Sequence, residues 1–362
     1  MPARKPGVTM LCRTVLMYSV VLASSTLLAQ TTAHHAKPAS SGQLVVVKTV
    51  ESQETASSFE HPIECDEDSN VYLKTDADGI SAIRKLSPAG ERIATFNAGT
   101  CPDIKVQLSA SFSVGSDNRV YQLVFPQDDP HRYVLVFDRD GSCHSKIKLD
   151  ASLRFIPYQI ATYPSGTMLI AGVRSIPGKD PDTMVPYTAL FSSSGDLLKA
   201  VDLQSDDEHP KADAGGNPSD AVPSNRGGKG AISRGMMQAA QDGNVYVVRH
   251  ELPAVIYAVS ESGAVVRHFT VDSGKADLMP SDMHIASNRI ALLFQNDRTH
   301  ESVLRVVNLN GEPVAEYAET LTPGKSSFGW AFVCYTYPPR DTFTFLTTLE
   351  GDELALRIVE PH

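Results

Sequence analysis

The sequence predicts an all-β fold made of repeated four-stranded units. Short segments rich in β-branched and aromatic residues alternate with polar turns along nearly the whole chain, a pattern typical of strands. The turns often place Gly after Asn, Asp or Ser, as tight hairpins require. No segment has the periodicity and capping residues of a long amphipathic helix. These three observations favour strands throughout.

The same unit recurs six times, at intervals of about 48 residues once one long insertion is set aside. Each unit has a short apolar strand, a polar turn, an apolar-aromatic strand, a third strand, and a glycine hairpin before a fourth. Second strands begin with Asn-Val-Tyr or Arg-Val-Tyr at 70–72, 119–121 and 244–246. The hairpin glycines are Gly90, Gly141, Gly195, Gly263 and Gly311.

The sixth unit, within 328–362, is one strand short, whereas an orphan strand precedes the first unit at 43–50. A propeller closes its ring when a terminal strand completes the last blade, which also removes an exposed sheet edge. The sequence therefore predicts a six-bladed β-propeller of four-stranded antiparallel blades, with its ring closed by the N-terminal strand 43–50.

The Asn-Val-Tyr and Arg-Val-Tyr strand starts, together with the hairpin glycines, resemble six-bladed propellers of the NHL-like and TolB-like superfamily. The resemblance covers nearly the whole mature chain. It implies the architecture and says little about activity. Trp-Asp repeat signatures are absent, because Trp330 is the only tryptophan.

The N-terminus has the features of a secretory signal. Arg4, Lys5 and Arg13 precede an apolar run at 15–29, and small residues at Thr31 and Ala33 fit a cleavage site. That run is too short to span a bilayer stably, and no second long apolar stretch follows. We expect a signal peptide at 1–33, a flexible leader at 34–41 and one propeller domain at 42–362. The protein is expected to be exported, periplasmic or extracellular, without stable membrane insertion.

Residues 205–232 are rich in Asp, Gly, Pro and Ser and are expected to form a disordered loop insertion. The insertion falls between the third and fourth units. It is interpreted either as a functional lid or partner-binding loop, or as an insertion that the fold tolerates.

Charge excludes one class of partner. Cleavage after residue 33 removes three basic and no acidic residues, which takes the formal charge from −10 to about −13. Such a surface repels nucleic acid, whose binding needs clustered Lys and Arg. A protein, peptide or glycan partner in the cell envelope is expected instead.

Four cysteines remain after cleavage: Cys65, Cys101, Cys143 and Cys334. In an oxidising compartment they allow three complete pairings, and free buried thiols are a further alternative. We take a disulfide between Cys65 and Cys101 as the first hypothesis. The spacings match no zinc motif.

Motifs that carry chemistry are absent. The sequence has no Gly-x-Ser-x-Gly nucleophile elbow and no phosphate-binding loop. The acidic clusters at 66–68 and 76–79 lack the offsets of a calcium loop. No metal ligand, cofactor or catalytic residue is predicted.

Propeller ligands bind where inner strands from several blades converge on one axis. Candidate ligand-binding residues near such strand starts are His61, Tyr158, Arg234, His284 and Trp330. Histidine suits metal binding or general-base chemistry, although a single His is more often a hydrogen-bonded structural residue.

Two functional hypotheses follow. The first is an exported, non-catalytic binding or protein-interaction module. The alternative is a metal-dependent hydrolase or lyase acting on a lactone or glycan, with calcium or zinc at the central channel. The alternative rests on analogy between related six-bladed folds, which does not by itself license a function.

Overall fold

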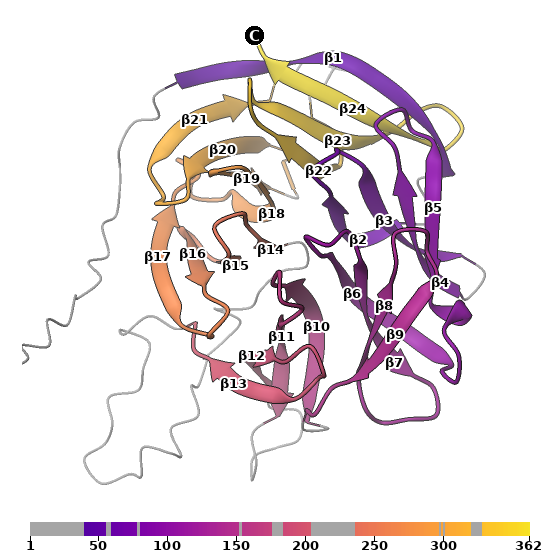
Figure 1. The fold of residues 1–362 in the computed structure, drawn as a ribbon. Helices are drawn as coiled ribbons and strands as arrows, with labels where there is room; N and C mark the ends of the chain where they lie inside the picture. Colours follow the sequence, from indigo (N-terminus) through magenta and orange to yellow (C-terminus); the bar gives the residue numbers. More distant parts are fainter. Residues whose placement is uncertain are drawn as a thin grey trace, which may run out of the picture. The chain divides into compact units, whose positions relative to one another are not determined.

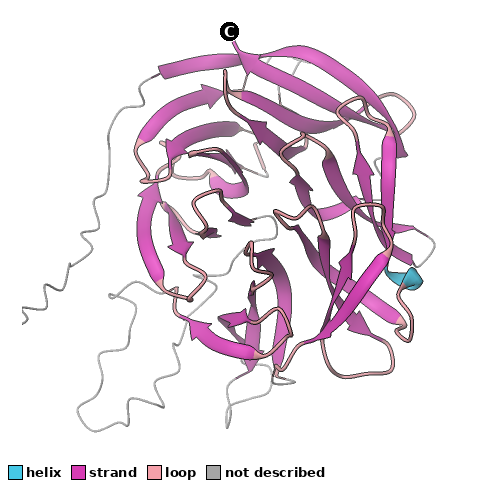
Figure 2. Cartoon of the chain, viewed as in Figure 1, coloured by secondary structure: helices cyan, strands magenta, loops and turns pink. Residues whose placement is uncertain are grey.

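The computed structural model describes residues 40–55, 59–77, 80–151, 154–175, 184–203, 236–296, 298–299, 301–319 and 328–362. In this part of the chain the only helical element is a single turn, η2 (Ala98–Thr100), so the all-β prediction is confirmed (Figure 2). The predicted signal peptide 1–33, leader residues 34–39 and the insertion 205–232 lie outside the described residues. None of the described helical structure is long and apolar enough to cross a membrane.

Four sheets have four antiparallel strands each, in chain order from the inside outward (Figure 1). The first contains β2 (Phe59–Cys65), β3 (Val71–Ala77), β4 (Ile80–Leu86) and β5 (Arg92–Asn97). The second contains β6 (Val106–Val114), β7 (Val120–Pro126), β8 (Tyr133–Phe137) and β9 (Cys143–Lys148). The third contains β10 (Phe155–Thr162), β11 (Met168–Ser175), β12 (Met184–Phe191) and β13 (Leu197–Val201). The fourth contains β14 (Met237–Ala239), β15 (Val245–Arg249), β16 (Ala254–Val259) and β17 (Val265–Val271).

The fifth sheet has eight strands, in the order β18-β19-β20-β21-β1-β24-β23-β22. Its strands are β18 (Met279–Ala286), β19 (Arg289–Gln295), β20 (Ser302–Asn308), β21 (Pro313–Ala318), β1 (Ser40–Thr55), β24 (Glu353–Pro361), β23 (Thr342–Thr348) and β22 (Ala331–Thr336). The prediction of six separate four-stranded sheets is therefore corrected to four such sheets and one of eight strands. The cause is β1, which pairs with strands on both of its sides.

Strand β1 is longer than predicted and connects three parts of the fold. Its first residues, 40–43, pair in parallel with β21, and 44–55 pair antiparallel with β24. The predicted pairing of 43–50 with the C-terminal strands is thus present, and residues 40–41 belong to the strand, not to a flexible leader. At its far end, the buried Glu54 carboxylate forms ion pairs with Arg84 of β4 and with Arg92 of β5 (Nε to Oε1, 2.5 Å).

A buried carboxylate also joins the two halves of the eight-stranded sheet. Asp341, just before β23, accepts hydrogen bonds from Tyr335 of β22 (2.6 Å), Tyr317 of β21 (2.8 Å) and Arg289 of β19 (2.9 Å). Three donors compensate the cost of burying this charge.

The apolar core is divided among the interfaces between neighbouring sheets. Strands β7 and β15 are buried along almost their whole length, because sheets cover them on both faces, whereas outer strands such as β9 and β13 are largely exposed. One cluster unites Val71 and Leu73 of the first sheet with Leu346 and Leu356 of the C-terminal strands. The first and last parts of the chain therefore share a core. The sheets are arranged in a propeller-like manner.

The predicted hairpin glycines have positive φ, and three of them also approach neighbouring backbone. A Cβ on Gly195 would lie 2.1 Å from the Lys148 carbonyl oxygen of β9. A Cβ on Gly141 would lie 2.2 Å from the Thr95 carbonyl oxygen of β5, the outer strand of the preceding sheet. A Cβ on Gly90 would lie 2.3 Å from the Glu51 carbonyl oxygen of β1. Only glycine fits such contacts. With respect to the first sheet, β1 therefore occupies the place of a preceding sheet's outer strand.

The recurrent tyrosines have a shared role in the turns. The hydroxyl groups of Tyr72, Tyr121 and Tyr246 donate to a carboxylate of the turn that precedes each strand. The acceptors are Asp66 (3.0 Å), Asp117 (3.3 Å) and Asp242 (2.9 Å). The Val-Tyr repeat thus fixes the turn between the first two strands of a sheet.

Candidate functional site

The candidate site lies where the first strands of the units meet. Strands β2, β6, β10, β14, β18 and β22 are innermost in Figure 1. Each contacts the next in this order, and β22 contacts β2, so the contacts form a closed cycle. Because each innermost strand has one edge without a strand partner, its free backbone groups need other partners.

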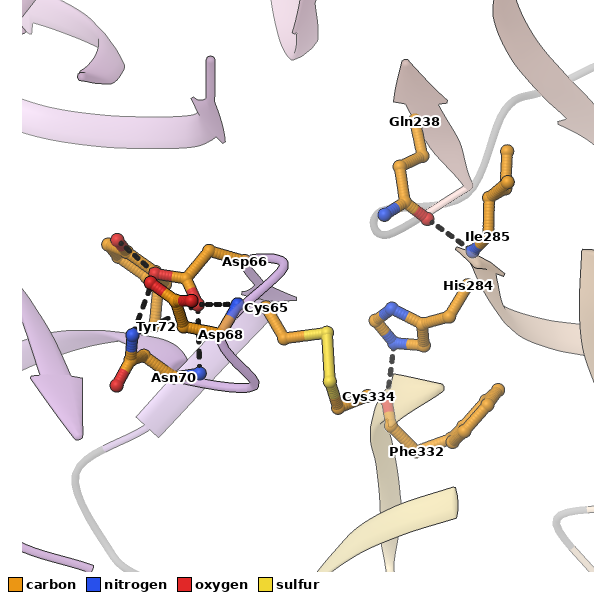
Figure 3. Close-up of a disulfide and its surroundings, with 10 residues drawn as sticks. All are labelled: Cys65, Asp66, Asp68, Asn70, Tyr72, Gln238, His284, Ile285, Phe332 and Cys334. Carbon is orange, nitrogen blue, oxygen red and sulfur yellow. Dashed lines mark hydrogen bonds between the residues drawn. A yellow bond between two sulfur atoms is a disulfide. The ribbon is translucent and has the colours of Figure 1, made fainter. Parts of the chain in front are cut away.

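Side chains at one equivalent position of the repeat accept hydrogen bonds from some of these free backbone N–H groups. Glu64 of β2 accepts a hydrogen bond from the Val114 backbone N–H of β6 (2.7 Å). Gln238 of β14 accepts one from the Ile285 backbone N–H of β18 (2.8 Å), as Figure 3 shows. Glu64 pairs with Tyr72, and Gln238 pairs with Tyr246, so both occupy the same position in their units.

Further links connect other neighbours in the cycle. Ser113 of β6, paired with Tyr121 at this same position, lies 3.3 Å from Thr162 of β10 between hydroxyl oxygens. A disulfide joins Cys65 of β2 to Cys334 of β22 (Figure 3). The inner strands are thus connected by side chains as well as by packing.

His284 of β18 is buried, being 4% exposed, and lies against β22. Its Nε2 is 3.1 Å from the Phe332 carbonyl oxygen (Figure 3). Because a carbonyl only accepts, Nε2 carries the proton and Nδ1 of the neutral ring is a bare acceptor. Nδ1 is buried and has no hydrogen-bond partner among the described residues. Burial lowers the pKa of His284 to about 4, and the nearby positive charge of His61 opposes protonation further.

Asp282, two residues earlier on β18, is 6% exposed. Its carboxylate lies 3.7 Å from Nδ1 of His61 on β2, and the Phe332 backbone N–H also stabilises the charged form. Burial nevertheless raises the pKa of Asp282. The side chain of His61 is 40% exposed, so it lies on the solvent side of the buried carboxylate. His61, Asp282 and His284 are called the axial cluster below.

Glu64 adds a second acidic group to the inner strands. The side chain keeps partial solvent access, but burial raises its pKa to about 8 despite the hydrogen bond from Val114. Glu64 can therefore remain protonated at neutral pH. In that form the carboxyl group is a hydrogen-bond donor as well as an acceptor.

The structure brings two of the five predicted site residues together, His61 and His284. Tyr158 lies on β10 at an irregularity of its pairing with β11, and Trp330 is 43% exposed just before β22. Arg234 lies outside the described residues.

Sequence reasoning missed Asp282, Glu64 and Gln238. Asp282 and His284 form an Asp-x-His pattern on a strand whose alternation places both side chains on one face, and this signal was present in the sequence. Glu64 and Gln238 occupy equivalent repeat positions, which an alignment of the units would have exposed.

The disulfide hypothesis was wrong. Cys65 pairs with Cys334, and Cys101 pairs with Cys143. The second bond joins the segment after η2 to β9 of the next sheet. Cys65 ends an inner strand while Cys101 follows an outer one, so the width of a sheet separates them. The two disulfides are typical of proteins outside the cytoplasm.

The described residues contain no group of three His, Cys, Asp or Glu side chains placed to hold a metal ion. What the axial cluster offers is a buried carboxylate, a buried imidazole acceptor and a half-exposed imidazole. Elsewhere, a surface hollow of about 510 Å³ is lined by charged side chains that include Asp103, Lys105, Asp128 and Lys146. Those side chains are exposed, and water can solvate them.

No protein-family model matches the chain, and no curated protein matches it. Solved structures do. A presumed exported protein of Bacteroides fragilis is similar, with 11% identity over 89% of this chain and 99% of that one, at a TM-score of 0.51. The chain folds as a β-propeller. At this identity the likeness shows the fold alone.

Two enzymes match less well. The PQQ-bound aldose sugar dehydrogenase of Streptomyces coelicolor has 11% identity over 90% of this chain and 100% of that one, at a TM-score of 0.47. A luciferin-regenerating enzyme has 10% identity over 87% and 97%, at a TM-score of 0.49. With these lower TM-scores, neither carries an argument about this propeller.

Proposed function

We propose that this propeller has six blades, of the NHL-like or TolB-like kind, and that its eight-stranded sheet forms two of these blades. One blade would be β18–β21, and the other β22–β24 with β1 outermost. The closed cycle of six inner strands supports this division. So does the equivalence of the Gly90 contact on β1 with the Gly141 contact on β5.

The proposed function is that of an exported, non-catalytic binding module whose ligand contacts the axial cluster. One observation carries this proposal: the buried Nδ1 atom of His284 has no hydrogen-bond partner among the described residues, and the buried carboxylate of Asp282 on the same strand has its cationic partner, His61, only at 3.7 Å. Buried polar groups without partners cost free energy and are uncommon unless they serve a function. A ligand that reached them would recover that cost.

The partner class follows from charge and compartment. An acidic surface disfavours nucleic acid, and the two disulfides suit the cell envelope. We therefore propose a protein, peptide or glycan partner in the envelope, held at the inner-strand end of the propeller.

The test compares the wild-type protein with Asp282→Asn on peptide and glycan arrays, with Asp117→Asn as the control. Asp117 lies in an exposed turn of the second sheet, between β6 and β7. We expect ligands that bind wild type and Asp117→Asn but not Asp282→Asn. An unchanged set of ligands on Asp282→Asn would overturn the proposal.

The alternative is a metal-dependent hydrolase or lyase acting on a lactone or glycan. It is favoured by the contact of His61 with a buried carboxylate, since an acidic partner orients a general-base imidazole. Bound calcium or zinc at a stoichiometric amount, lost with chelator together with hydrolysis of a lactone or glycan, would establish it. An active protein would lose turnover in His61→Ala.

A further inference from the structure

The axial cluster presents acceptors side by side. Asp282 and His284 are two residues apart on β18, so their side chains lie on the same face of the strand. One residue of β22, Phe332, orients both side chains. Its backbone N–H donates a hydrogen bond to the Asp282 carboxylate, and its carbonyl oxygen accepts one from Nε2–H of His284. The remaining capacity of both side chains is to accept hydrogen bonds.

The cluster also lacks a fixed positive charge. His61 is the only cationic side chain paired with Asp282 among the described residues, and its 3.7 Å separation exceeds hydrogen-bonding distance. The ring of His61 is half-exposed, so water solvates it. A buried carboxylate without a close cation is costly, and the raised pKa of Asp282 reflects that cost through burial.

A ligand group that completes this arrangement would carry positive charge and donate hydrogen bonds without needing to accept any. An ammonium has three N–H donors and no acceptor, and a guanidinium has five donors and no acceptor. A hydroxyl or a carboxylate would bring acceptor lone pairs against Asp282. The acidic chain, at −10 overall, also attracts cations.

We propose that the axial cluster selects a ligand with a cationic N–H donor group, a primary ammonium or a guanidinium, which binds the Asp282 carboxylate and turns one donor toward Nδ1 of His284. The group enters past His61, whose imidazole swings aside. This inference rests on the proposed binding function and specifies its ligand. The ligand is either a Lys or Arg side chain of a peptide or a free polyamine.

Protonation competes with this ligand. Asp282, whose pKa is raised by burial, takes up a proton as the pH falls, and His61 on β2 lies 3.7 Å from its carboxylate. The other titratable groups of the packed elements are Glu64 on β2, His284 on β18 and His250, whose Nδ1 contacts the Pro280 carbonyl oxygen (3.1 Å). A neutral Asp282 no longer attracts a cation, which weakens the binding of the ligand. Affinity is therefore expected to fall as the pH drops from 7.5 to 5.5.

The experiment is isothermal titration calorimetry at pH 7.5 and 5.5. The probes are an acetylated and amidated Gly-Lys-Gly peptide, the matched peptide with norleucine in place of lysine, and putrescine. The proteins are wild type, Asp282→Asn, His284→Phe and the control Asp277→Asn, whose exposed carboxylate accepts a hydrogen bond from the Asn296 side chain (2.8 Å). Circular dichroism melting verifies that each variant is folded.

We expect the lysine peptide or putrescine to bind wild type and Asp277→Asn at pH 7.5. Asp282→Asn should weaken that binding about tenfold or more, and His284→Phe several-fold, in keeping with lost charge-assisted hydrogen bonds. The norleucine peptide should not bind. Stronger binding of the lysine peptide than of putrescine would identify a peptide source, and the reverse a polyamine.

Failure of the inference is distinguishable from failure of the proposed function. If neither cationic probe binds, while array ligands bind wild type and are lost in Asp282→Asn, the cationic ligand class is overturned and the binding site stands. If cationic probes bind Asp282→Asn as well as wild type, the inference is overturned. If no probe and no array ligand depends on Asp282, both are overturned.

Discussion

His284 is held between two inner strands with one ring nitrogen bonded and the other bare. In the folded protein burial lowers its pKa to about 4, against an ordinary 6.5. Between these values the unfolded chain binds more protons than the folded one. The free energy of unfolding therefore rises with pH across this window. The contribution of His284 to stability is lost as the pH falls from 6.5 toward 4.

The pH prediction for His284 uses His284→Gln, whose amide can donate to the Phe332 carbonyl but does not titrate. Between pH 6.5 and 4, the free energy of unfolding measured with urea should decrease by up to about 3 kcal/mol more for wild type than for this variant. Parallel pH profiles for His284→Gln and wild type would contradict the prediction.

Glu64 changes the free energy of unfolding with pH in the opposite direction to His284. Burial raises its folded pKa to about 8 from 4.5, so between these values the folded protein binds more protons. The free energy of unfolding therefore falls as the pH rises from 4.5 to 8. A Gln side chain would keep the acceptor for the Val114 N–H without the ionisation.

We predict that Glu64→Gln is more stable than wild type at pH 8, by about 2 kcal/mol after discounting for solvent access, and nearly equal at pH 4.5. The comparison is urea unfolding at both pH values. Glu67→Gln, at an exposed turn three residues along, should change neither value. A variant that is less stable at pH 8 would show that the charged form is the stabilised one.

Strand β1 stabilises the fold through a few buried positions along its length. Leu44 is 1% exposed and packs with the core between β20, β21 and the C-terminal strands, whereas Val46 is 46% exposed. Truncating a buried Leu removes transfer free energy and leaves a cavity. Truncating an exposed Val on the same strand removes little.

Leu44→Ala should therefore lower the free energy of unfolding by about 3 kcal/mol, and Val46→Ala by less than about 0.5 kcal/mol. Denaturation in urea, followed by circular dichroism, measures both. Equal effects would mean that β1 contributes through strand pairing alone. That result would contradict its role in the core.

The two disulfides close loops of very different length. Cys65 and Cys334 are 269 residues apart, whereas Cys101 and Cys143 are 42 apart. In the chain-entropy account, a longer closed loop removes more entropy from the unfolded chain. The resulting stabilisation of the folded protein is about 5–6 kcal/mol for the first disulfide and about 4 kcal/mol for the second.

We predict that replacing Cys65 and Cys334 with Ser destabilises more than replacing Cys101 and Cys143 with Ser. Thermal unfolding of the two double variants, beside wild type, makes the comparison. The first bond also joins β2 to β22, where the two ends of the ring meet. The reverse order of stability would show that unfolded-state entropy does not govern these bonds.

For the whole molecule, export and oxidation are expected to go together. The chain should lose residues 1–33 on export, which mass spectrometry of the secreted protein measures directly. All four cysteines of the mature chain are then expected in disulfides, so thiol titration of the denatured, exported protein should detect none. An intact N-terminus or free thiols in the exported protein would contradict this.

Much of the fold was predictable because its determinants are local. The positive φ of hairpin glycines such as Gly141, the Val-Tyr strand starts and the turn carboxylates are requirements within one unit, and their short range leaves a repeat in the sequence. The deficit of one strand at the C-terminus, with an extra strand at 43–50, likewise predicted the pairing of β1 with β24. The sequence also indicated His61 and His284 as candidates.

What only the tertiary structure decided depends on how the sheets are set against one another. The parallel pairing of 40–43 with β21, the partners of the four cysteines and the contact of His61 with Asp282 all join segments far apart in the chain. Such contacts depend on the angle and register between sheets, and no local pattern encodes either quantity. By itself, the sequence determined the repeating unit and the strand that pairs with its last copy. The tertiary structure determined that a buried carboxylate and a bare imidazole nitrogen meet at the inner strands.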